Sequence, residues 1–314
     1  MYSRRHLRVK VLQTLYAYQQ SEMNNLELGE KMLLKNAEEM YQMYWQNLLI
    51  ISDLCEFTNK YADFEDGKML ATVRNEKLDR KFAHNIFAVT LNRNEQFTKQ
   101  VKGYNLHNNL STEMMRDVFV AFIKSEEYQN YLQSPENSVA ETVELVQNLY
   151  RNYLLKNTDV ESQFEETSIL WQSDKEHVRA AVLRTIKSLG ASAGTEIALE
   201  PISQNWTEDR SMLKNLFKKC VLNHEAFATL IEQKAQNWEA DRIAPIDRLL
   251  IVQALCEMVD FENIPVKVTI NEYLEIAKVY STPKSKMFIN GVLDAIAKDL
   301  IASGKIVKSG RGLV

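Results

Sequence analysis

Apolar residues recur at intervals of three and four along most of the chain, the spacing that gathers side chains on one face of an α-helix. The first such segment is residues 4–20. Its charged residues cluster in the first two turns, whereas the later turns are apolar and suited to packing. The pattern predicts a helix that is basic at its start and has an apolar face formed by Leu7, Val11, Leu15 and Tyr18.

Periodicity and helix-capping residues predict further helices. Ser138 with Glu141, and Ser173 with Glu176, have the spacing of a capping box, in which a hydroxyl and a carboxylate cap the start of a helix. Pro245 stands where the first turn of another helix would begin. The predicted helices cover residues 4–20, about 26–64, 80–91 and 112–132, from 138, 173–189, from 207, 225–238, from 245, 266–280 and from 282, with loops at 102–109 and 190–194.

Glycine and proline are scarce, at 9 and 5 of 314 residues, which leaves few tight turns for a β-sandwich or barrel. We therefore expect an all-α fold. The longest apolar stretch, near residues 249–258, is too short to span a bilayer, and the basic N-terminus does not continue into a signal-peptide core. The three cysteines lie far apart without zinc-ligand spacing, as in a cytoplasmic protein with reduced thiols.

Charge is unevenly distributed along the chain. Residues 1–21 contain three Arg and one Lys and no acid, and residues 303–314 contain three bases and no acid, whereas the remainder holds 31 bases and 42 acids. An acidic body with a basic first helix should repel nucleic acid over most of its surface and attract phosphate at one place. The alternative interpretation of the basic residues is a solvated first turn.

No pattern of catalytic residues is present. None of the five histidines has a paired carboxylate or cysteine at catalytic spacing, and neither a Gly-x-Ser-x-Gly nor a His-Glu-x-x-His sequence occurs. The glycine-containing segment 190–194 lacks the Gly-Lys-Ser/Thr ending of a phosphate-binding loop. We expect no enzymatic activity, no cofactor, no metal and no small-molecule substrate.

Three segments follow one another in the C-terminal third: residues 264–272 (IPVKVTINE), 275–278 (EIAK) and 286–294 (KMFINGVLD). Together they resemble the signature of the NusB family of bacterial transcription antitermination factors. Residues 247–250 and 254–258 resemble the preceding helix of that family. The Thr14-Leu15-Tyr16 sequence resembles part of its arginine-rich first helix.

The resemblance implies an all-α fold of two small NusB-like bundles, here with a large helical insertion. It also implies binding of boxA-type RNA from ribosomal RNA operons together with NusE, a protein of the small ribosomal subunit, in an antitermination complex with RNA polymerase. By position, the resemblance implies that Tyr16 and Asp247 contact NusE. It implies RNA contacts by Arg4, Arg5, Arg8 and Lys10 of the first helix and by Lys284, Ser285, Lys286 and Phe288 of the last.

Phe288 could equally be a core residue or a ring that stacks on a base. Lys284 stands where the family often has an acid, and Val252 where an arginine is common. The resemblance divides the chain into an RNA-binding first helix (1–21), a helical insertion of unknown role (22–205), a NusB-like core (206–302) and a basic tail (303–314). Two other functions stay open: modification of ribosomal RNA through an attached NusB-like domain, and a purely protein-binding helical scaffold.

Overall fold

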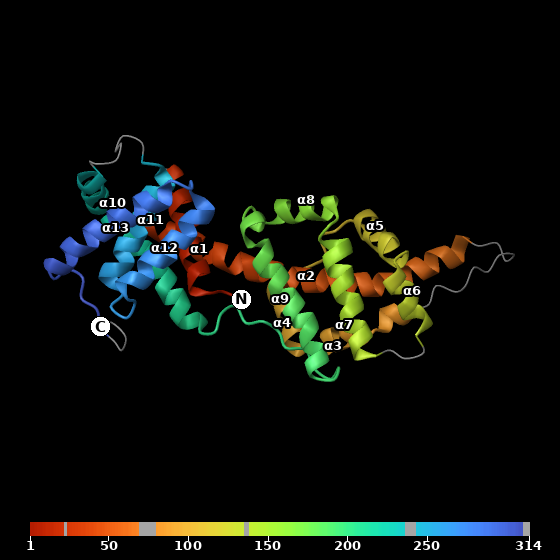
Figure 1. Cartoon of the computed structure of the whole chain (residues 1–314). Helices are drawn as coiled ribbons and strands as arrows, with labels where there is room; N and C mark the ends of the chain where they lie inside the picture. Colours follow the sequence, from red (N-terminus) through yellow and green to blue (C-terminus); the bar gives the residue numbers. More distant parts are fainter. Residues whose placement is uncertain (22–23, 69–79, 135–137, 236–242, 310–314) are drawn as a thin grey trace. The chain divides into compact units, whose positions relative to one another are not determined.

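The computed structural model describes residues 1–21, 24–68, 80–134, 138–235 and 243–309. Within these ranges all regular secondary structure is helical, which confirms the predicted fold class (Figure 1). The chain divides into two compact units. The central unit comprises Met1 and Glu38–Ile202, and the terminal unit comprises Tyr2–Ala37 and Ser203–Val314.

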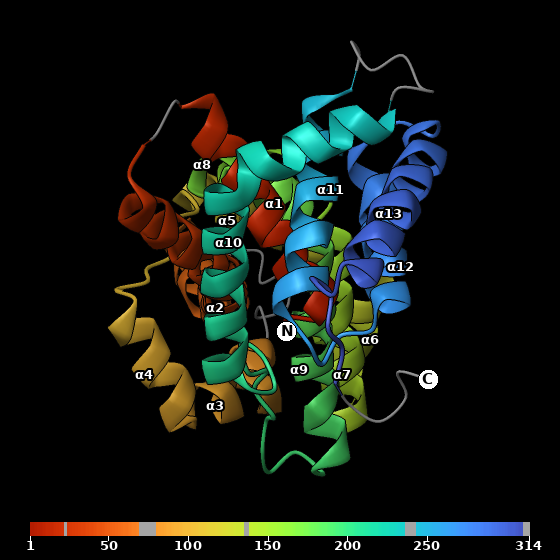
Figure 2. The ribbon, with the colours of Figure 1, turned by 90° about the vertical axis from the view of Figure 1, so that its left-hand side faces the viewer.

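The terminal unit is a helical bundle in which α11 occupies the centre (Figure 2). This helix packs against each of the other four long helices of the unit, and side chains on all its faces are buried, as expected of a central helix. The first turns of α2 (Leu26–Lys68) also belong to this unit. Its other helices are α1 (Arg4–Gln20), α10 (Trp206–Lys234), α11 (Pro245–Asp260), α12 (Val266–Tyr280) and α13 (Ser285–Ala302).

Local sequence signals determine several boundaries of this bundle. Helices α1 and α12 have the bounds that the sequence predicts, with Pro265 immediately before α12. The Ser3 hydroxyl caps α1 by accepting a hydrogen bond from the His6 N–H at 3.3 Å. Pro245 lies in the first turn of α11, where its missing N–H costs no helical hydrogen bond.

Several predicted helix starts are wrong. The last helix, predicted from residue 282, begins at Ser285. The predicted break before Glu225 does not occur, because α10 contains neither Gly nor Pro and continues as one helix. Asn205, and not Thr207, caps the start of α10. Ser173 lies inside α9 (Trp171–Ala191), where its hydroxyl donates to the backbone carbonyl of Leu170 at 2.8 Å.

The central unit contains the rest of α2 and shorter helices around a core rich in aromatic side chains. Trp45, Trp171, Tyr150 and Phe122 are among its fully buried residues. Its elements after α2 are a 3-10 turn (Arg80–His84), α3 (Ile86–Arg93), α4 (Glu95–Gly103), α5 (Thr112–Ile123), α6 (Glu126–Gln133), α7 (Val139–Asn148), a π turn (Leu149–Leu154), α8 (Thr158–Thr167) and α9.

Side-chain caps account for the breaks within the central unit. Ser138 caps α7 through a 3.2 Å hydrogen bond from the Glu141 N–H, as its capping-box spacing predicts. The single helix predicted over 112–132 is two helices, because Ser125 caps α6 in the same way. The sequence does not predict α4, which Asn94 caps.

Candidate nucleic-acid interface

The first turn of α1 presents two arginines to solvent. The side chains of Arg4 and Arg5 are 46% and 47% exposed. Arg4 Nη2 lies 2.6 Å from Glu208 Oε1, and Arg4 Nε lies 3.5 Å from Asp209 Oδ1. The Arg4 guanidinium is therefore accessible but already paired with carboxylates at the start of α10.

Arg5 forms a bidentate ion pair with Glu272 of α12. Its Nε and Nη2 donate to the two carboxylate oxygens at 2.9 and 2.8 Å. The hydrogen bond from Arg5 lowers the pKa of the Glu272 carboxyl, and it raises the pKa of Arg5. This fork geometry is the one with which a guanidinium also binds phosphate, so Glu272 occupies a potential phosphate position.

Arg8 and Lys10 are buried, and this disagrees with the expectation that they contact RNA. Arg8 is 3% exposed, and its Nε and Nη2 donate to Glu257 of α11 at 2.7 and 2.8 Å. Burial alone would lower the pKa of Arg8, but the hydrogen bond and negative charge of Glu257 outweigh it and raise the pKa. Neither cation can bind phosphate without leaving the core, because the residues from Leu7 to Leu12 are all buried.

The start of α13 supplies two exposed cations. Lys284 and Lys286 are exposed, whereas Ser285 is buried and its hydroxyl bonds with that of Ser281 at 2.9 Å. The Phe288 ring is only 9% exposed, which favours the core interpretation over base stacking. Met287, at 68% exposed, is the accessible apolar side chain at this helix start, although no local sequence signal distinguishes it from a core residue.

One cation from each group, Arg5 of α1 and Lys286 of α13, acts on the same stretch of α12. The pKa of the Glu275 carboxyl is lowered by a hydrogen bond from Lys278, and further by the charges of Lys278, Arg5 and Lys286. Arg5 and Lys286 are therefore both within electrostatic reach of one carboxylate. Helix α12 also packs against both α1 and α13. The structure thus brings the first turn of α1 and the start of α13 to one acidic segment of α12.

The two expected partner contacts differ in accessibility. Tyr16 is 40% exposed on the side of α1. Asp247 is 5% exposed, and its carboxylate accepts a hydrogen bond from the Ser281 hydroxyl. Asp247 therefore connects the start of α11 to the turn between α12 and α13, and only Tyr16 offers a large accessible surface.

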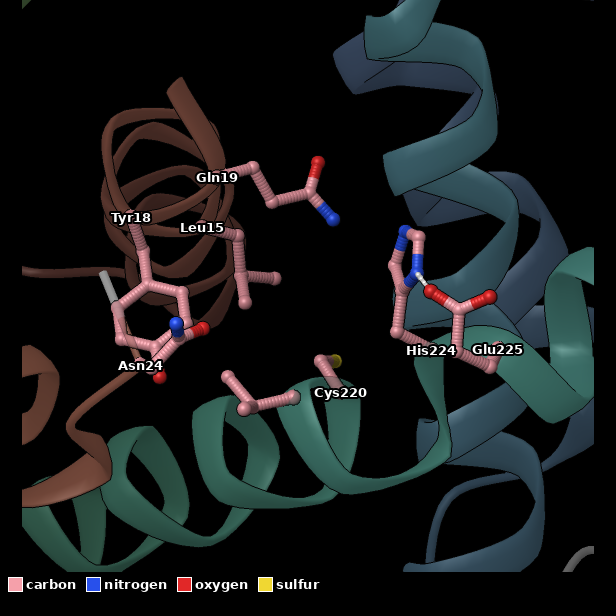
Figure 3. A pocket seen from close by; sticks show the side chains of 8 residues that line it. Leu15, Tyr18, Gln19, Asn24, Cys220, His224 and Glu225 are labelled. Carbon is pink, nitrogen blue, oxygen red and sulfur yellow. Dashed lines mark hydrogen bonds and ion pairs between the residues drawn. The ribbon is translucent and has the colours of Figure 1, made fainter. Parts of the chain in front are cut away.

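The other end of α1 lines a cavity of about 530 Å³ shared with α10 (Figure 3). On one side of it, His224 Nδ1 lies 3.3 Å from Glu225 Oε1. No Lys or Arg is among the lining residues, so the cavity has no strong phosphate-binding group. Its walls are Leu15, Tyr18, Gln19, Asn24, Cys220, Val221, His224 and Glu225.

The described part of the C-terminal tail is attached to the bundle. Ile306 is buried, and Lys308 Nζ donates to the Phe261 carbonyl at 2.8 Å. Burial lowers the pKa of Lys308. The Ser309 N–H donates to the Glu262 carbonyl at 3.1 Å. Lys308 is thus engaged with the fold, and Arg311 lies outside the described residues.

Across the described ranges, no group of three His, Cys, Asp or Glu residues is arranged to hold a metal ion. No helix within those ranges is long and apolar enough to cross a membrane.

Comparison with protein families matches residues 177–298 to the NusB family. The chain is 47% identical over 105 residues to the transcription antitermination protein NusB of Salinibacter ruber, covering 33% of this chain and 66% of that protein. The NusB protein of Chloroherpeton thalassium is 42% identical over 105 residues, which cover 33% of this chain and 50% of that protein. The NusB protein of Koribacter versatilis is 42% identical over 98 residues, which cover 31% of this chain and 67% of that protein.

No solved structure is significantly similar to the chain. The chain spans between half and about two thirds of the length of these curated relatives. The matched segment begins in α9 and ends in α13, so it contains the α11–α13 bundle with its acidic α12 segment. The fold and this match define the class: an all-helical protein with a NusB domain. The chain belongs to the NusB family.

Proposed function

We propose that this protein is a non-enzymatic transcription antitermination factor that binds boxA-type single-stranded RNA of ribosomal RNA operons together with NusE, in a complex with RNA polymerase. Family membership supports this function. The observation that carries the RNA site is that Arg5 is hydrogen-bonded to Glu272 of α12, while the charges of Arg5 and Lys286 both act on Glu275, three residues further along that helix. We infer that one strand contacts both cations there.

The proposed RNA contacts are the accessible part of the set expected from the sequence. Arg4 and Arg5 offer planar guanidinium groups for phosphate or for stacking on a base, and Lys284 and Lys286 offer point charges. Met287 adds exposed apolar surface beside Lys286 for an unstacked base. On the partner side, Tyr16 contacts NusE directly, and Asp247 acts by holding the α12–α13 turn through Ser281.

A second candidate function is a scaffold that binds protein but not RNA. Its supporting observation is that Arg4 and Arg5 are already paired with Glu208, Asp209 and Glu272. A scaffold would retain NusE binding while showing no salt-sensitive RNA binding.

Replacing both Arg5 and Lys286 by alanine should weaken binding of a boxA-type strand about tenfold near 0.1 M salt, because each cation neutralises one phosphate. The slope of log K against log salt should become shallower by about 1.4, which corresponds to two phosphates of a single strand. Fluorescence anisotropy of labelled RNA over a salt series measures both quantities.

Lys234→Ala is the control for the loss of one exposed cation, because Lys234 is an ion-paired lysine of the same unit, 2.6 Å from Asp299 near the far end of α10. Its RNA affinity should equal that of the unmodified chain. Unchanged affinity in the Arg5 and Lys286 double variant would remove the proposed RNA site, and retained NusE binding would then favour the scaffold.

Glu272→Gln should tighten RNA binding about threefold, since it removes the carboxylate that competes with phosphate for Arg5. The gain should largely disappear in an Arg5→Ala background, as a double-mutant cycle would reveal. Glu232→Gln is the control for net charge, because Glu232 is paired with Arg248 at 3.2 Å near the C-terminal end of α10. Equal or weaker RNA binding by Glu272→Gln would mean that Glu272 orients Arg5 and does not compete with RNA.

A further inference from the structure

The central unit is acidic except for one segment. Residues 113–202 contain 15 acidic and 8 basic residues, and residues 38–68 contain 7 acidic and 2 basic. Residues 80–112 contain five basic residues and one acid, Glu95. This segment includes α3 and α4, which together carry three bases, Arg93, Lys99 and Lys102, and one acid.

Helices α3 and α4 form a corner held by one asparagine. The Asn94 N–H donates to the Leu91 carbonyl at 3.0 Å, which ends α3. Its side-chain oxygen accepts from the Phe97 N–H at 3.1 Å, which starts α4. Phe87, Leu91 and Phe97 are buried and fix the inner face of the corner. The polar residues of both helices are therefore held on the outer face.

Three cations on this corner are exposed and have no ion-pair partner among the described residues. Arg93, Lys99 and Lys102 form no ion pair or side-chain hydrogen bond with any residue that the structure describes. By contrast, Arg80 is paired with Asp63 at 2.5 Å, and Lys81 donates to two backbone carbonyls. Lys99 and Lys102 are neighbours on α4, because residues three apart share a helix face.

The chemistry of this surface fits a phosphate backbone. Exposed amides, Asn92 and Gln96, accompany the cations, and Arg, Lys, Asn and Gln are the side chains that bind phosphate and sugar. None of the exposed large hydrophobic side chains in the described ranges lies between residues 80 and 112. Protein interfaces concentrate aromatic residues and Met at their centre, and membrane-surface helices need an apolar face.

We propose that the α3–α4 corner, through Arg93, Lys99 and Lys102, binds the backbone of RNA that flanks the boxA-type segment. This inference extends the proposed function and rests on it for the identity of the RNA. The corner would act independently of α1 and α13. It adds affinity for long transcripts through contacts with the RNA backbone that do not depend on base sequence.

The test compares two RNAs in full-length protein: a boxA-type segment alone, and the same segment within a transcript of about 40 nucleotides. The triple variant Arg93→Ala, Lys99→Ala, Lys102→Ala should bind the long RNA about thirtyfold more weakly near 0.1 M salt, with a salt slope shallower by about 2, which corresponds to three phosphates. Its affinity for the short RNA should not change.

The control is the triple variant Lys124→Ala, Arg151→Ala, Lys156→Ala, which removes the same charge from exposed positions elsewhere in the central unit. It should bind both RNAs like the unmodified protein. An equal loss in the two triple variants, or no loss on the long RNA, overturns the proposal. Retained RNA binding with weaker binding to RNA polymerase would assign the corner to a protein partner and also overturn it.

Failure of the proposed function gives a different result. In that case the unmodified protein would not bind the short RNA, and Arg5→Ala with Lys286→Ala would change nothing. A selective loss on the long RNA in the corner variant would still support RNA binding by α3 and α4.

Discussion

Arg8→Met should destabilise the terminal unit by about 3–5 kcal/mol, because it leaves the buried carboxylate of Glu257 without its cation. Glu257 is fully buried, and among the described residues the hydroxyls of Thr269, at 2.8 Å, and Tyr273, at 3.4 Å, also donate to it. Two neutral hydroxyls cannot neutralise the carboxylate charge as the bidentate guanidinium of Arg8 does. Urea unfolding of the full chain should show a lower midpoint for the terminal unit.

The double variant Arg8→Met with Glu257→Leu separates packing from charge. Replacing both members of a buried ion pair by apolar residues of similar volume is often nearly neutral, so much of the lost stability should return. This variant should also bind RNA like the unmodified protein, since Arg8 is buried. Stable protein with weakened RNA binding would restore Arg8 as an RNA contact.

The pairing of Arg8 shows where the sequence was insufficient. The basic start of α1 was predicted correctly as a helix, but its four cations were treated alike, and the partner of Arg8 lies 249 positions away. One local signal was present. Glu257 is a single acid within the apolar run 254–258 of a central helix, and a lone acid in such a position requires a buried partner.

Helix bounds were predictable where a local signal acts alone. Apolar spacing predicted α1, Pro265 predicted the start of α12, and the Ser138 capping box predicted the start of α7. The prediction of α4 failed because Asn-rich sequence usually indicates a turn, whereas Asn94 here ends one helix and starts the next. The buried Phe97 then holds α4 in place by tertiary packing, which the sequence does not reveal.

Helix α2 approaches α1 and α10 closely at Gly29. A Cβ atom at this position would lie 2.7 Å from Phe217 Cζ and 2.9 Å from Tyr18 Cδ2. These two rings pack edge to face, with centroids 5.6 Å apart, and both are buried. Because both rings are packed in the core at this point, the absence of a side chain on Gly29 allows the first turn of α2 to pack against the bundle.

Gly29→Leu should therefore destabilise the terminal unit by about 3 kcal/mol, at the upper end of the cost of overpacking a core. Leucine favours a helix by nearly 1 kcal/mol over glycine, so the clash must exceed that gain for any loss to appear. Gly103→Leu in α4 is the control, because no atom lies within 4 Å of its added Cβ, and its stability should not fall. Equal unfolding midpoints for the two variants would show that the Tyr18 and Phe217 rings yield to an added side chain.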